Sequence, residues 1–146
     1  MWEPDEAAYS LLPLMKGVSL LFCAKRDAEI LYGFSGTVEE VIIQLDELTN
    51  AENIVVSIGA EGIVGWDGRR FIRQSAYEAM IIDPLGAGDA LAAGVIHGWL
   101  QGEFSRGLQM GSALAAMALG QVGDMVVITQ AALDDLLEKG QRGLRR

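Results

Sequence analysis

Two carboxylates and two glycines lie close together in residues 82–91, which read Ile-Asp-Pro-Leu-Gly-Ala-Gly-Asp-Ala-Leu. Asp83 and Asp89 flank a turn that contains Gly86 and Gly88. The glycines allow the backbone to bend tightly and to come close to a ligand. The apolar pattern predicts that a helix begins at this turn, where free N–H groups and the positive end of the helix dipole point outward together. The turn is therefore a candidate site for an anion such as phosphate.

Asp89 adds a second kind of chemistry to the turn. A carboxylate contributes little to phosphate binding, but it can accept the proton of an attacking hydroxyl group. An anion-binding turn with a carboxylate in the first turn of the following helix indicates phosphoryl transfer to an alcohol. The alternative is that the glycine-rich turn only allows a strand and a helix to pack tightly.

The segments around the turn alternate between strand-like and helix-like patterns. We expect a strand over residues 77–82 before the turn and a helix from Ala90 to about Leu100 after it. Thr37, followed by Glu40 three positions later, matches a capping box, and Asp67-Gly68 predicts a hairpin. Further helices are expected over 3–16, 25–32, 38–48, 103–119 and 130–139, the last ending at Gly140, and further strands over 18–23, 53–58, 63–66 and 69–73. The pattern predicts one α/β layered domain over residues 1–146, with a mainly parallel sheet.

The composition limits the partners that this chain is expected to bind. A hydrophobic content of 51% predicts a folded chain, and a formal net charge of −9 argues against a nucleic acid or an anionic membrane surface as a partner. The apolar run at 85–100 is interrupted by Asp89 and by glycines, which makes it too short and too polar to span a membrane. Cys23 is the only cysteine, so no intrachain disulfide can form. This fits a reducing compartment, and we expect a cytoplasmic protein.

Residues 83–89 as a whole resemble the second signature of the ribokinase, or phosphofructokinase-B, family of carbohydrate kinases, whose pattern is Asp-Thr-x-Gly-Ala-Gly-Asp. The proline at position 84 is most similar to members that act on 2-keto-3-deoxygluconate. Residues 55–62 resemble the strand and Gly-x-x-Gly turn beside the nucleotide phosphates, and residues 115–124 resemble the helix and loop under the adenine and the monovalent cation. We interpret Asp124 as a turn residue rather than a part of the cation site. The resemblance implies a ribokinase-like α/β fold.

The resemblance also implies roles for individual residues. Asp89 would be the general base that takes the proton from a sugar hydroxyl. The backbone N–H groups of Gly86, Ala87 and Gly88 would stabilise the charge that develops on the transferred phosphoryl group. Asp83 matches a position that helps to bind a monovalent cation such as K⁺. The residues expected to contact ATP are Ser57, Gly59, Gly62, Gly86 and Gly88.

One local departure from the family's pattern concerns Mg²⁺. Family members usually carry Asn-x-x-Glu after the strand expected over 18–23, where the motif supports Mg²⁺ and phosphate. Ala24 and Asp27 occupy these two positions here. Asp27 keeps a carboxylate and is a candidate for a role linked to Mg²⁺, with a solvated helix carboxylate as the alternative, whereas Ala24 has no polar side chain. Mg²⁺ would then be held mainly by ATP oxygens and water.

A larger departure is length. The first glycine signature, most sugar contacts and the lid of the family lie in an N-terminal half that has no counterpart in this sequence, which resembles the C-terminal, nucleotide-binding half. Our first hypothesis is an ATP-dependent kinase of a sugar or sugar acid. The alternatives are a non-catalytic nucleotide-binding remnant and an assembly half that needs an N-terminal partner. Without that half, an uncovered sheet edge and apolar surface predict homo-oligomers.

Overall fold

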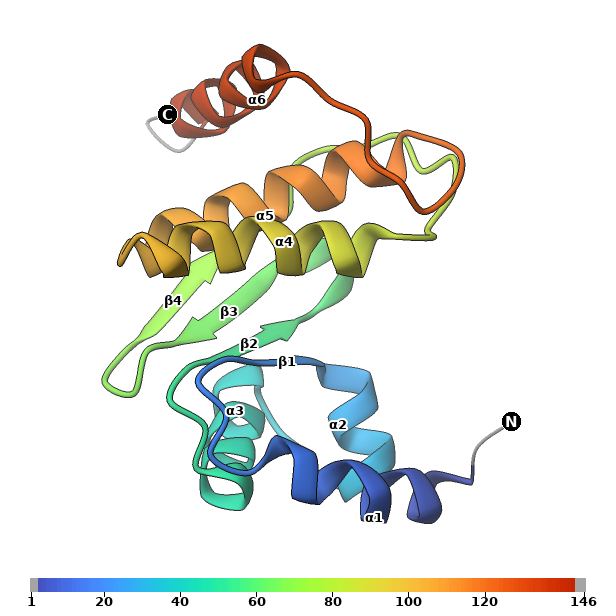
Figure 1. Ribbon diagram of the computed structural model, residues 1–146, viewed down its shortest axis with the longest axis vertical. Helices are drawn as coiled ribbons and strands as arrows, with labels where there is room; N and C mark the ends of the chain where they lie inside the picture. The colour runs from blue at the N-terminus through green and yellow to red at the C-terminus, as the bar shows by residue number, and fades with distance from the viewer. Residues whose placement is uncertain (1–2, 144–146) are drawn as a thin grey trace. The chain divides into compact units, whose positions relative to one another are not determined.

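The computed structural model describes residues 3–143 of the chain, which divide after Arg73 into two compact units (Figure 1). Each unit has its own helices and its own packing. The expectation of one domain over the whole chain stays a prediction. None of the helices among the described residues is long and apolar enough to span a membrane.

The first unit contains a four-stranded sheet in the order β1-β2-β3-β4, with helices before and between the strands. Strands β1 and β2 run parallel, with Ala24 of β1 paired with Ser57 of β2 at their carboxyl ends. Its elements are α1 (Pro4–Met15), β1 (Leu21–Ala24), α2 (Lys25–Tyr32), α3 (Val38–Thr49), β2 (Ile54–Ser57), the short 3₁₀ helix η1 (Gly59–Glu61), β3 (Ile63–Trp66) and β4 (Phe71–Gln74).

Local signals determine where the helices of this unit begin and end. Helix α2 ends at Gly33, whose φ of 66° lies in the left-handed region that favours glycine. Helix α3 begins with the expected capping box, in which the Thr37 Oγ1 accepts a hydrogen bond from the Glu40 N–H at 3.2 Å, and Glu40 accepts one from the Thr37 N–H at 2.6 Å. The expected strand at 63–66 and the hairpin at Asp67-Gly68 are also confirmed.

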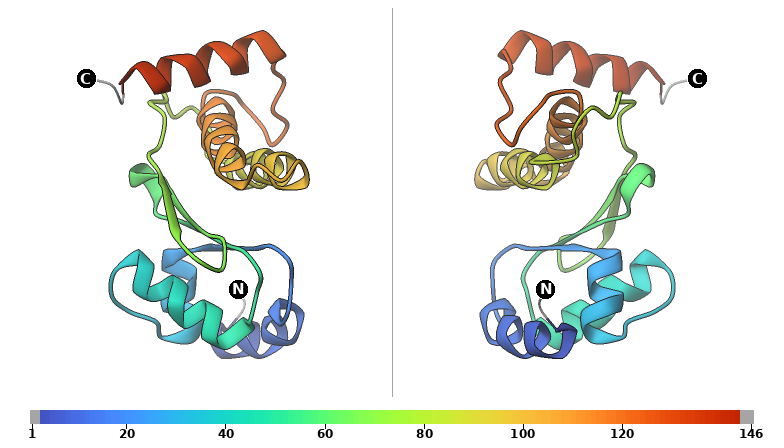
Figure 2. Two further views of the ribbon diagram at one scale, coloured as in Figure 1. Left: turned by 90° about the vertical axis from the view of Figure 1, so that its left-hand side faces the viewer. Right: turned by 90° about the vertical axis from the view of Figure 1, so that its right-hand side faces the viewer.

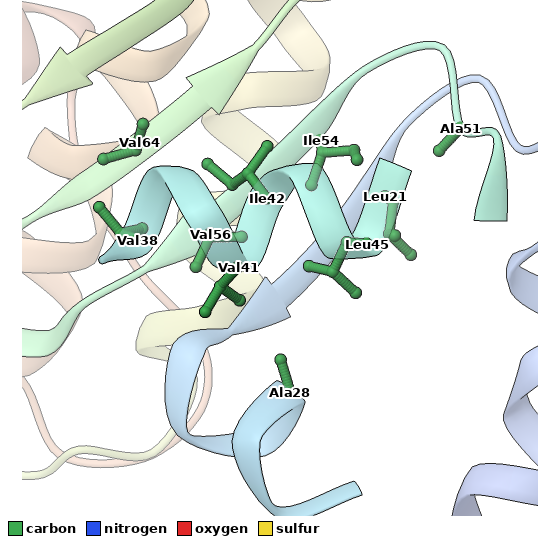
Figure 3. Close-up of a cluster of buried hydrophobic side chains, with 10 residues drawn as sticks. All are labelled: Leu21, Ala28, Val38, Val41, Ile42, Leu45, Ala51, Ile54, Val56 and Val64. Atoms are coloured by element: carbon green, nitrogen blue, oxygen red, sulfur yellow. The ribbon is translucent and has the colours of Figure 1, made fainter. Parts of the chain in front are cut away.

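A hydrophobic core holds helices α2 and α3 against the sheet (Figures 2 and 3). Val41, Ile42 and Leu45 of α3 are completely buried and lie with Ile54 and Val56 of β2 in one cluster. Burying an aliphatic side chain of this size stabilises a fold by about 1.5–3 kcal/mol. The helix that follows the capping box is therefore fixed on the sheet, and the carboxyl ends of β1 and β2 are fixed with it.

Two expectations about strands are corrected. The sheet is α/β as expected but mixed, because β2 pairs antiparallel with β3, and the turn between them is too short for a parallel crossover. The strand expected over 77–82 is absent from the described residues. The N–H groups of Ile82 and Asp83 instead donate to the carbonyl of Leu119, at 2.7 and 3.3 Å, and the apolar side chains of Met80 and Ile81 stay exposed.

The second unit consists of three helices, α4 (Ala87–Leu100), α5 (Phe104–Leu119) and α6 (Gln130–Gly143). Helices α4 and α5 lie side by side and approach so closely that backbone meets backbone (Figures 1 and 2). A Cβ at Gly94 would lie 2.5 Å from the backbone N of Gly111, and one at Gly98 would lie 2.4 Å from the Cα of Gly107. Glycines four residues apart share one face of a helix, so both helices present a groove without side chains.

Helix α6 packs on α5 through Leu133 and Leu137, which form a small core with Ala113. The Thr129 Oγ1 accepts a hydrogen bond from the Ala132 N–H at 3.2 Å, which confirms the expected N-cap. The expected end of the helix at Gly140 is wrong, because the helix continues to Gly143. Gly140 instead makes room for a ring, since a Cβ there would lie 2.4 Å from Cε1 of Tyr77.

Candidate active site

The turn over residues 83–89 lies in the second unit and is held by its own side chains and by the loop after α5. Gly86 is the N-cap of α4, and its φ of 78° lies in the left-handed region. A Cβ at this position would lie 2.6 Å from the carbonyl oxygen of Asp124 and 2.9 Å from its Cα. The position therefore requires glycine for two reasons: its φ angle and the close approach of a second backbone segment.

Asp83 connects the turn to the same loop. Its Oδ1 accepts a hydrogen bond from the Leu85 N–H at 3.0 Å, and its Oδ2 accepts one from the Gly123 N–H at 3.1 Å. These two backbone donors lower the pKa of the Asp83 carboxyl below its ordinary value, with the Leu85 N–H as the larger cause. Both oxygens keep further lone pairs that are available to a cation. The role of Asp83 in binding a monovalent cation stays a prediction.

Asp89 lies in the first turn of α4 with an exposed side chain. The first N–H group with an acceptor inside the helix is that of Ala90, which donates to the Gly86 carbonyl at 2.9 Å. The N–H groups of Ala87 and Gly88 precede it and have no acceptor within the helix. Asp89 and these backbone N–H groups thus lie within one helical turn, at the helix start that the sequence predicts, and their chemical roles stay a prediction.

A cavity of about 660 Å³ lies in the first unit, at the carboxyl ends of β1 and β2. Ligands of α/β proteins commonly bind in this position, outside the carboxyl ends of parallel strands. Ser57 and Gly59, two of the residues expected to contact ATP, line the cavity. Gly62 closes the turn behind them, since its carbonyl accepts from the Ile58 N–H at 2.9 Å and its φ is 109°. The full lining is Ala24, Lys25, Arg26, Glu29, Thr37, Val38, Ser57, Ile58, Gly59, Glu61 and Arg73.

Asp27, the candidate for a role linked to Mg²⁺, lies beside this cavity but is not part of its lining. Its side chain is exposed. The pKa of the Cys23 thiol is raised to about 11, mainly by burial and in smaller part by the negative charge of Asp27. Among residues 3–143, no three His, Cys, Asp or Glu side chains are placed to hold a metal ion together. The role of Asp27 stays a prediction.

The cations of the cavity were missed by the analysis of the sequence. Lys25, Arg26 and Arg73 all line it, and they come from the start of α2 and from β4. The pair Lys25-Arg26 directly after a strand was a signal that could have been used, because the carboxyl end of a strand is a common ligand site. No signal in the sequence indicated Arg73, which is brought to the cavity by the hairpin.

Comparisons with known proteins agree with the resemblance found in the sequence. Residues 1–131 match the model of a family described as pfkB family carbohydrate kinase. The 2-dehydro-3-deoxygalactonokinase of Haloferax volcanii is 26% identical over 147 residues, which are 100% of this chain and 46% of that protein. The 2-dehydro-3-deoxygluconokinase of Thermoproteus tenax is 34% identical over 129 residues, which are 85% of this chain and 38% of that protein. The chain therefore spans less than half the length of these relatives.

The fold has close counterparts among solved structures. The crystal structure of 2-dehydro-3-deoxygluconokinase from Thermotoga maritima has a TM-score of 0.83 and 21% sequence identity, over 94% of this chain and 46% of that chain. This similarity confirms the ribokinase-like α/β fold expected from the sequence. As with the relatives, the part that corresponds to this chain is less than half of the structure.

Proposed function

Because the chain belongs to the pfkB family of carbohydrate kinases, we propose that it carries the phosphoryl-transfer turn of an ATP-dependent kinase of a sugar or sugar acid. One observation supports this most. Gly86 is held in the left-handed region against Asp124, and it starts a helix whose first turn exposes Asp89. This arrangement keeps a proton acceptor at a fixed distance from free backbone donors.

In the proposed reaction, Asp89 accepts the proton of the substrate hydroxyl group while the hydroxyl oxygen attacks the γ-phosphorus of ATP. The bond between the γ-phosphorus and the bridging oxygen breaks, and ADP leaves with that oxygen. The N–H groups of Gly86, Ala87 and Gly88 stabilise the negative charge on the transferred phosphoryl oxygens. Asp83 holds the turn in place through the Leu85 and Gly123 amides and would also contribute an oxygen to a K⁺ site. Mg²⁺ would supply further positive charge to the phosphates, and nucleotide oxygens and water would be its main ligands.

We propose the cavity of the first unit as part of the nucleotide site. Ser57 and Gly59 line it and offer a hydroxyl and a backbone without a side chain. A Cβ at Gly59 would meet no other atom within 4 Å, so a ligand can come close to this backbone. Gly62 acts indirectly, by closing the turn that presents Gly59.

For the acceptor, 2-keto-3-deoxy sugar acids are the first candidates. The two curated relatives described above are kinases of 2-dehydro-3-deoxygalactonate and 2-dehydro-3-deoxygluconate by name. The resemblance of the Asp-Pro-Leu-Gly-Ala-Gly-Asp turn points in the same direction. Neutral sugars such as fructose form the second group to be tested.

The test is a coupled assay of ADP release with ATP, Mg²⁺ and a panel of sugars and sugar acids. Asp89→Asn is expected to lower turnover by about 10²–10⁴-fold and to leave ATP affinity nearly unchanged. Asp5→Asn is the matched control, because Asp5 is also an exposed carboxylate in the first turn of a helix, α1. Equal turnover of the Asp89→Asn and Asp5→Asn proteins would show that Asp89 is not the base.

Two alternatives follow from the observation that the chain spans less than half of its relatives. A non-catalytic remnant would bind ATP without turnover on any acceptor. An assembly half would bind no ATP at millimolar concentration until an N-terminal partner is added. Calorimetry with ATP and Mg²⁺, followed by the turnover assay, separates the three hypotheses.

A further inference from the structure

The cavity at the ends of β1 and β2 contains three cationic side chains, and two of them are neutralised by carboxylates. Lys25 forms an ion pair with Glu29 one helical turn later in α2. Arg73 forms one with Glu39 of α3, with its Nε 2.9 Å from Oε1. Each of these two cations thus already has a carboxylate partner, with which the phosphate of a ligand would have to compete.

Arg26 is different. No carboxylate among residues 3–143 lies within ion-pair distance of its guanidinium, although the side chain lines the same cavity. Its position is fixed at the start of α2, whose residue Ala28 is completely buried against the sheet. The cavity therefore has one guanidinium with free donors on a rigid element.

Neutral donors lie around the same cavity. Ser57 ends β2, the parallel neighbour of β1, and Gly59 follows it with an open backbone. Thr37 lines the cavity as well, but its Oγ1 is already used by the Glu40 N–H in the capping box. A guanidinium next to hydroxyl and backbone donors suits the planar, bidentate recognition of phosphate oxygens.

The negative charge of Glu61 opposes the positive charge of Arg26 in this cavity. Glu61 also lines the cavity, and no cation among the described residues lies within ion-pair distance of it. The lining as a whole then carries three cations and two carboxylates, in a chain whose formal net charge is −9. Removing either free charge should change the affinity of the cavity for an anion, in opposite directions.

We propose that Arg26 is a phosphate-binding residue of this cavity and that it contacts the polyphosphate chain of the nucleotide. The identity of the ligand as a nucleotide rests on the proposed function. The assignment of an anion site to Arg26 rests on the cavity itself. The guanidinium provides the charge, Ser57 and Gly59 provide neutral donors, and Lys25 and Arg73 are already paired with carboxylates.

The test is calorimetry on the full chain with three probes: inorganic tripolyphosphate, adenosine and ATP. Arg26→Gln is compared with Arg69→Gln, a control in which an exposed arginine of the β3–β4 hairpin, outside the cavity, loses the same charge. Arg26→Gln is expected to lower the affinity for tripolyphosphate and for ATP about tenfold or more, which is the usual contribution of a charge-assisted hydrogen bond. Adenosine affinity should not change, and Glu61→Gln should strengthen tripolyphosphate binding.

The outcomes separate this inference from the proposed function. ATP binding that is equal in the Arg26→Gln and Arg69→Gln proteins would overturn the role of Arg26 and leave the kinase proposal standing. Binding of tripolyphosphate that depends on Arg26, without binding of adenosine and without any turnover, would overturn the kinase proposal and support the anion site. A wild-type chain that binds none of the three probes would overturn both.

Discussion

Replacing Gly86 with alanine should break the contact between the turn over residues 83–89 and the loop after α5. The residue has a φ of 78°, and a non-glycine residue in the left-handed region costs about 1–2 kcal/mol. The new Cβ would also lie 2.6 Å from the Asp124 carbonyl oxygen and 2.9 Å from its Cα. Both are backbone atoms that cannot rotate away, and such overpacking costs about 1–3 kcal/mol. We therefore expect a loss of about 2–5 kcal/mol in the free energy of unfolding.

Gly88→Ala is the matched control, because it adds the same methyl group two residues later in the same turn. A Cβ at Gly88 would meet nothing within 4 Å, and its φ is not in the left-handed region. Alanine is favoured over glycine inside a helix by about 0.8–1.0 kcal/mol, so this change should be neutral or slightly stabilising. Gly86→Ala should thus lower the free energy of unfolding, whereas Gly88→Ala should leave it unchanged or raise it slightly.

Urea unfolding followed by circular dichroism measures the difference, and hydrogen exchange read by mass spectrometry localises it. In Gly86→Ala, exchange should accelerate in peptides that cover residues 83–90 and 119–125. Peptides from strand β2 in the first unit are the internal reference. Equal stability of the two variants, together with unchanged exchange over 119–125, would refute the reasoning.

Three further predictions concern the second unit. Gly98→Ala and Gly111→Ala should each lower the stability of the helix pair α4–α5 by about 1–3 kcal/mol in urea unfolding, since each Cβ would lie within 2.5 Å of the other helix; unchanged midpoints would contradict this packing. Asp83, whose pKa is lowered by backbone donors, should stabilise the fold above its unfolded-state pKa of about 3.9 and lose this effect as the pH falls through its lower folded-state pKa. The stability difference between wild type and Asp83→Asn should therefore vanish in acid; a difference independent of pH would contradict it. Light scattering should detect dimers or larger species, because Met80, Ile81 and Val122 are 79%, 69% and 82% exposed, and a clean monomer at high concentration would count against this.

The elements that the sequence predicted well are those determined by neighbouring residues. The capping box of Thr37 and Glu40 involves residues three positions apart, and the left-handed Gly33 directly follows the helix that it ends. The helix start at the Asp89 turn belongs to the same class, because the glycine-rich turn directly precedes the helix. For these features, the types and spacing of nearby residues were sufficient.

The features that were missed depend on contacts between distant residues. Arg73 reaches the cavity beside Glu39, 34 positions away, and Asp83 binds the Gly123 amide, 40 positions away. The apolar run before the turn has the composition of a strand, yet its amides donate to the end of α5. The glycines of α4 were taken only as interruptions of an apolar run, because their purpose becomes visible only beside the glycines of α5.

The position of Asp89 depends on contacts that lie entirely within the second unit, through Asp83, Gly86, Gly123 and Asp124. These contacts should therefore keep the shape of the turn without residues from outside this unit. Turnover also requires an acceptor held near the base, and such positioning can account for about 7–11 kcal/mol of a barrier. If most sugar contacts lie outside this chain, as the resemblance implies, a formed turn with slow turnover is what the kinase proposal predicts. A slow rate alone would then not distinguish an enzyme part from a remnant. The dependence of that rate on Asp89 would distinguish them, because the Asp89→Asn substitution slows even a slow transfer only if Asp89 acts as the base.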